Sequence, residues 1–153
     1  MMTSMPTQSL QDTINRLEAA LLTPVISGEM AGWIRNVQQA AATLAVDWTG
    51  HLHSVLHAQY REITQTDPEL SPRVEKLIET DEQLLQELTR FHEELHDLEQ
   101  QAGQVGWQES KLAAQRQHLE ETGLHLIQQI KKQEVAGGTW LAEALYRDRG
   151  TVD

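Results

Sequence analysis

Seven histidines and many carboxylates are the residues of this chain best suited to chemistry. Imidazole nitrogens and carboxylate oxygens bind divalent metals, and histidine exchanges protons near neutral pH. Two histidines stand four residues apart in the string His92-Glu93-Glu94-Leu95-His96. On a helix this spacing places both rings on one face, where they can bind zinc while the intervening glutamate acts as general base. The string therefore predicts a metal-dependent hydrolase as one alternative, although no third ligand typical of zinc proteases follows it.

Other signatures of catalysis are missing from the sequence. There is no glycine-rich phosphate loop, no Gly-x-Ser-x-Gly elbow and no cysteine. The lack of cysteine excludes disulfides, iron–sulfur clusters, thiolate zinc sites and cysteine nucleophiles. We therefore predict no catalytic residues and no cofactor-binding residues, leave the cofactor open apart from a divalent metal, and favour a protein that is not an enzyme.

A second group of polar residues interrupts rows of apolar residues that have helical spacing. His51, Asp81 and Gln133 each break such a row from within. We expect residues in these positions to be buried, and buried polar groups need partners. Three other histidines are most simply interpreted as exposed to solvent or satisfied at helix boundaries: His53, His57 and His96.

Hairpin geometry sorts these residues into two levels. At about 1.5 Å per residue in antiparallel neighbours, His51 comes level with Asp81. Gln133 then lies about a turn away, with His125 on the flank. We predict a site for a divalent metal, iron or zinc, at this level, with His51, Asp81, His125 and Gln133 as its ligands. A weaker second cluster consists of His92, His96 and His118.

The elements that must position these residues are helices. Strand signals are nearly absent, and glycines and prolines cluster between long stretches of helical spacing. Gly50 indicates a local break or a close contact within the second stretch, because glycine is unfavourable in the middle of a helix. The expected helices run from about Ser9 to Leu22, Glu29 to Thr64, Ser71 to Gln101 and Gln108 to Val135, with a short helix from Trp140 to Tyr146 after an interruption at Gly137-Gly138.

These helices predict an all-α fold. Short turns favour an up-down-up-down four-helix bundle with a short C-terminal helix, and an elongated helical hairpin that dimerises is the alternative. We expect a flexible N-terminus over residues 1–8, one domain over residues 9–147 and a flexible tail over residues 148–153.

Charge and hydropathy bear on partners and compartment. The 153 residues include 23 acidic and 12 basic side chains, which gives a formal net charge of −11. This balance argues against nucleic acid, whose binding depends on basic residues that neutralise phosphates, and against an anionic membrane surface. No apolar run approaches the ~20 residues that span a membrane, and residues 1–10 lack the features of a signal peptide. We expect a cytoplasmic protein.

Most of the chain resembles the hemerythrin-like, or HHE cation-binding, family. The resemblance rests on Leu17-Glu18-Ala19-Ala20-Leu21 before a Pro/Gly turn, on Trp33 to His51, on Asp67 to Leu77, and on Gly137 with Leu141-Ala142-Glu143-Ala144. It implies a four-helix bundle around a non-haem di-iron centre, with ligands from all four helices. His51 matches the second-helix histidine of the family, whereas other residues stand at further ligand positions: Val55, Asp81, Leu85 and Gln133.

The sequence therefore predicts a non-catalytic binding or sensing domain with a degenerate di-iron site. We expect some affinity for a divalent metal but no full di-iron centre. One alternative is a metal-free module that binds a protein partner or a second copy of itself through Trp107, Trp140 and Tyr146, since aromatic residues are enriched at interfaces. The other is the hydrolase built on His92, Glu93 and His96.

Overall fold

Four long helical segments make up the part of the chain that the computed structural model describes, residues 5–104 and 108–150. The first segment is α1 (Met5–Leu22). In the second, α2 (Met30–His51) continues through a π-helical turn, η2 (Leu52–Leu56), into α3 (His57–Thr66). A 3₁₀ turn, η3 (Pro68–Leu70), precedes α4 (Ser71–Ala102), and α5 covers Glu109–Gly150. No strand occurs among these residues, so the prediction of an all-α fold is confirmed.

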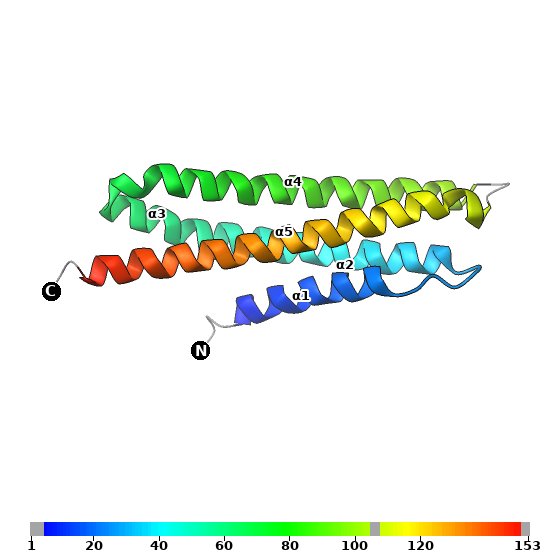
Figure 1. Cartoon of the computed structure of the whole chain (residues 1–153), viewed down its shortest axis with the longest axis horizontal. Coiled ribbons are helices and arrows are strands. Elements are labelled where there is room, and N and C mark those ends of the chain that lie inside the picture. The colour runs from blue at the N-terminus through cyan, green and yellow to red at the C-terminus, as the bar shows by residue number, and fades with distance from the viewer. Residues whose placement is uncertain (1–4, 105–107, 151–153) are drawn as a thin grey trace.

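The four segments lie side by side, and consecutive segments run in opposite directions (Figure 1). α1 contacts α2 and α5, and α4 contacts the same two helices. Gly28 in the first connection has φ +86°, a backbone conformation that glycine adopts without strain. Pro72 in the first turn of α4 and Gly103 after its last turn mark the limits of that helix, close to those predicted.

The core is a set of apolar side chains that all four segments contribute. Apolar residues at helical spacing in α1, α4 and α5 are buried, among them Leu17, Leu88, Leu95 and Ile130, which confirms the helical periodicity. Gln133, which we expected to be buried, is half-buried. The largest fully buried side chains include Trp48, Tyr60, Phe91, Met30 and Leu88.

No helix among residues 5–104 and 108–150 is both long enough and apolar enough to cross a membrane.

The π-helical turn changes which side chains of the second segment face the core. Leu44, Trp48, Leu52, Leu56 and Tyr60 recur at intervals of four, and all five are buried. In a regular α-helix an interval of four drifts by about 40° per repeat, or about 160° from the first of these residues to the last. The π-helical turn accommodates one extra residue, which offsets about 100° of this rotation. The row therefore keeps facing the core.

Gly50 lies two residues before the π-helical turn. The break predicted near it begins at Leu52, two residues later, but the expected close contact is wrong. Gly50 is exposed, and a Cβ atom built there meets nothing within 4 Å. Val55, which stands where the resembled family has a metal ligand, is half-buried.

The predicted interruption at Gly137-Gly138 and the separate terminal helix are wrong, because α5 continues without a break to Gly150. Gly137 is buried, and a Cβ atom there would collide with the Tyr60 hydroxyl. This glycine therefore allows α5 and α3 to approach closely and does not end the helix. Helix also covers residues 5–8 and 148–150, which we expected to be flexible. Residues 1–4 and 151–153 lie outside the described part.

Candidate functional site

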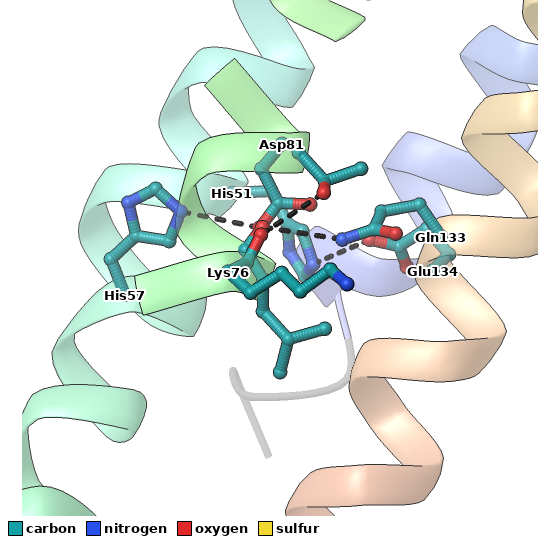
Figure 2. Close-up of polar contacts among 8 residues, drawn as sticks. His51, His57, Lys76, Asp81, Gln133 and Glu134 are labelled. Atoms are coloured by element: carbon teal, nitrogen blue, oxygen red, sulfur yellow. Dashed lines mark hydrogen bonds and ion pairs between the residues drawn. The ribbon is translucent and has the colours of Figure 1, made fainter. Parts of the chain in front are cut away.

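Two histidine–carboxylate pairs lie where the π-helical turn joins α2 to α3. His57 Nε2 is 3.3 Å from Asp81 Oδ2, and His51 Nε2 is 3.1 Å from Glu134 Oε1. His57 and Asp81 are each 1% exposed and His51 is 9% exposed, whereas Glu134 is half-buried. We call these four residues together with Gln133 the inner cluster (Figure 2).

Asp81 is the centre of the inner cluster. His57 approaches it from one side, and Gln133 and Glu134 of α5 lie on the other (Figure 2). Burial raises the pKa of Asp81, while hydrogen bonds from Gln133 and His57 act in the opposite direction. Gln133 also donates from Nε2 to the carbonyl oxygen of Leu77, at 3.2 Å. Three helical segments thus hold this carboxyl group in place.

Tyr60 extends the inner cluster toward α5. Its ring centroid is 6.1 Å from that of His57 and 5.6 Å from that of Trp140. Burial, followed by the nearby carboxyl groups of Asp81 and Glu134, raises the pKa of Tyr60 above its ordinary value. Its hydroxyl group is buried without a hydrogen-bond partner, and so is Nδ1 of His51.

A group of three side chains on the outside of the same turn has the spacing of metal ligands. His53, His57 and Glu82 each offer one ligand atom, and these atoms lie within 4.8 Å of one another. His53 and Glu82 are exposed, whereas His57 is buried. We call these residues the outer trio. Among the described residues, no other group of three or more histidine, cysteine or acidic side chains has its ligand atoms this close together.

The residues of the predicted metal site do not all come together. His51, Asp81 and Gln133 meet at one level, but Asp81 is paired with His57 and His51 with Glu134. His125 is exposed and lines a separate hollow with Arg90 and Phe91. That His51 and Asp81 share a metal stays a prediction. His125 is not part of the group that these two residues form with Gln133.

The second predicted cluster is dispersed along α4 and α5. His96 is exposed, and its Nδ1 atom is 3.9 Å from Glu99 Oε1. His118 is exposed and lines a groove with Asp97 and Leu98. His92, His96 and His118 do not form a converging group of three ligands within the described residues.

The groups present do not fit a hemerythrin-type di-iron centre. The resemblance implies ligands from all four helices, but the described part of α1 offers no histidine to the inner cluster. Its buried polar residue, Thr13, hydrogen-bonds to the carbonyl oxygen of Leu10. The two histidines and two carboxylates of the inner cluster are moreover paired with each other.

Sequence reasoning missed His57, Glu134 and Tyr60. The signal that could have found His57 and Tyr60 is the row of apolar residues at intervals of four, which indicates a wide turn. No comparable signal points to Glu134, since it follows Gln133 directly and its partner depends on how α5 is aligned against α2.

Trp140 does not fit the predicted interaction surface. It is buried against Tyr60, whereas Tyr146 is 80% exposed. Trp107 lies outside the described residues.

Comparisons with known proteins do not assign the chain to a family. No protein-family model matches it, and neither a curated protein nor a solved structure is significantly similar to it.

Proposed function

We propose that this protein is a non-catalytic binding or sensing domain that takes up one divalent cation at or beside the inner cluster. Its architecture in this proposal is an up-down-up-down four-helix bundle of the hemerythrin-like type. The observation that carries the proposal is a pair of histidine–carboxylate contacts from three helical segments at one level, of which His57–Asp81 is buried and His51–Glu134 is partly buried. The antiparallel course of the four segments and the contacts that join α1 and α4 to both α2 and α5 support the architecture.

Physical chemistry favours a binding role for these residues over a purely structural one. Buried ionisable groups are destabilising unless they are paired, and apolar side chains of similar size often serve a core equally well. Within the inner cluster, Nδ1 of His51 is buried without a partner, as the indole nitrogens of Trp33 and Trp48 are elsewhere in the core. Imidazole and carboxylate groups together are also the ligands that Zn²⁺ and similar cations prefer. A cation could take His51 Nδ1, the metal-binding atom of the inner cluster that lacks a partner, as one of its ligands.

Metal content and thermal unfolding together test the proposal. Untagged protein purified without added metal is analysed for its elements, and its Tm is then measured with EDTA and with ZnCl₂. We expect one equivalent of metal and a higher Tm with zinc, because a ligand at 100 times its Kd stabilises the folded state by about 2.7 kcal/mol. MgCl₂ serves as the control and should have little effect.

Two outcomes contradict the proposal. If the protein holds no metal and its Tm is the same in EDTA and in zinc, the domain is not a cation sensor. About two irons per chain with visible absorption would instead restore the family's di-iron chemistry, against the fit described above.

An interaction surface is the second candidate function. An open groove of about 1020 Å³ runs along α1, the first connection and the start of α2, with Arg16, Trp33 and Arg35 among its lining residues. Ile26 in this groove is 63% exposed, and Leu22 beside it is 59% exposed. Light scattering on metal-free protein tests this candidate, since a stable dimer would favour it and a monomer at all concentrations would count against it.

A further inference from the structure

We propose that His53, His57 and Glu82 form a binding site for one divalent first-row transition metal, with Asp81 holding His57 in position from behind. This inference deepens the function proposed above and rests on it, because it moves the cation from the interior to the outer trio. Asp81 is a positioning residue in this arrangement and not a ligand.

The ligand atoms of the outer trio converge beside the π-helical turn. Its three ligand atoms lie within 4.8 Å of one another, and the ring centroids of His53 and His57 are 5.6 Å apart. His53 lies in the π-helical turn and His57 begins α3, so the wide turn places both rings on the side that faces α4. Glu82 follows Asp81 on α4, and the same helix therefore supplies the third ligand and the group behind His57.

The two nitrogens of His57 have different roles in this proposal. Nε2 is 3.3 Å from the Asp81 carboxylate, and Nδ1 points away from Asp81 (Figure 2). When the carboxylate accepts a hydrogen bond from Nε2–H, the Nδ1 lone pair remains for a metal. Histidine ligands in metalloproteins characteristically donate their other N–H to a carboxylate in this way, which fixes the ring and raises its basicity. This buried pair is what distinguishes the outer trio from an incidental group of surface side chains.

The ligand set determines the class of metal. Two imidazole nitrogens and one carboxylate oxygen suit Zn²⁺, Co²⁺, Ni²⁺ or Cu²⁺, whereas Mg²⁺ and Ca²⁺ prefer oxygen ligands alone. Three protein ligands leave a position that water or another ligand can occupy. The formal net charge of −11 also favours the approach of cations.

Calorimetric titration of the full-length protein with ZnCl₂ tests the site. We expect His53→Ala and Glu82→Gln each to weaken zinc binding by at least ~10-fold, and Asp81→Asn to weaken it by about 10-fold through loss of the carboxylate that positions His57. His53 and Glu82 are exposed, so both variants should keep the helical circular dichroism of the wild type. Two matched controls should bind as the wild type does: Glu79→Gln changes an exposed acid one helical turn before Glu82, and His118→Ala changes an exposed histidine of α5.

Co²⁺ adds a spectroscopic measurement. Its visible absorption reports coordination by nitrogen and oxygen, and this band should be lost or shifted in His53→Ala but unchanged in His118→Ala. A structural role for His53 would leave the band as it is.

The outcomes separate this inference from the proposed function. If the wild type binds zinc and both His53→Ala and Glu82→Gln bind it equally well, the outer trio is not the site. Loss of binding in His51→Ala under those conditions would place the cation in the inner cluster, and the proposed function would stand. If the wild type binds no zinc, cobalt or nickel, both the inference and the proposed function fail.

Discussion

Tyr60 combines a ring that packs well with a hydroxyl group that is buried and unsatisfied. The ring packs between His57 and Trp140, but the buried hydroxyl lacks a hydrogen-bond partner. A buried polar group left unsatisfied destabilises the folded state by about 1–3 kcal/mol. The nearby carboxyl groups of Asp81 and Glu134 also disfavour the ionised form of Tyr60.

Tyr60→Phe should therefore stabilise the protein by about 1 kcal/mol at pH 7, measured by urea unfolding. The difference should grow in alkaline solution. The pKa of Tyr60 is raised in the folded state, so ionisation favours the unfolded chain. The free energy of unfolding is therefore unaffected by this ionisation below the ordinary tyrosine pKa of ~10 and falls as the pH rises above it. The wild type should lose stability more steeply than the variant between pH ~9 and ~11, and parallel pH profiles would show that Tyr60 is not the group responsible.

At the scale of the helix, Gly137 links the packing of α5 to this same hydroxyl. A Cβ atom at Gly137 would collide with Tyr60 Oη, whereas a Cβ atom at the exposed Gly138 meets nothing within 4 Å. Neighbouring glycines in one helix thus have different consequences. One permits a close approach of two helices, and the other only lowers helix propensity.

Gly137→Ala should destabilise the protein by about 1–3 kcal/mol, since overpacking forces the Tyr60 ring or the α5 backbone to move. Gly138→Ala should be neutral or stabilising by up to ~1 kcal/mol. Tyr60→Phe removes the atom that collides, so it should rescue most of the loss at Gly137 in a double-mutant cycle. Equal losses from Gly137→Ala in the wild type and in the Tyr60→Phe variant would contradict this account of the contact.

Periodicity predicted the helices well, because a row of buried leucines at intervals of three and four is a direct consequence of α-helical geometry. It also predicted that Asp81 and His51 are buried, since both interrupt such rows. It failed where the geometry departs from 3.6 residues per turn. The π-helical turn brings His57 inward, and a regular helix would have carried it away from Asp81.

Contacts between helices were harder to predict than the helices themselves. The partner of His51 depends on how far α5 slides along α2, and the rows of apolar residues alone do not determine that alignment. The prediction at Gly137 failed for a related reason. Glycine as a helix terminator and glycine as a point of close approach look the same in a sequence, and only the neighbouring Tyr60 distinguishes them.

For the whole molecule, the dominant property is its charge. The formal net charge is −11, and four of the seven histidines are exposed on different parts of the surface: His53, His96, His118 and His125. Histidine gains a proton near pH ~6.5, so mild acid reduces the repulsion between copies of the chain. A net charge nearer zero promotes association.

Light scattering coupled to size exclusion should therefore give a larger mean mass at pH 5.5 than at pH 8. Raising the salt concentration at pH 8 should act in the same direction, because salt screens the repulsion between negative charges. Identical masses under all three conditions would show that charge repulsion does not control the assembly of this protein.

The π-helical turn at Leu52–Leu56 is equivalent to one residue inserted into a regular α-helix. Loss of Ser54, which is exposed, would convert the turn to regular α-helix and leave His57 and Tyr60 facing the core. The same loss would place His53 and His57 three residues apart and so rearrange the surface pair. A change of one codon would thus alter the spacing of His53 relative to His57 while His57 keeps its place against Asp81.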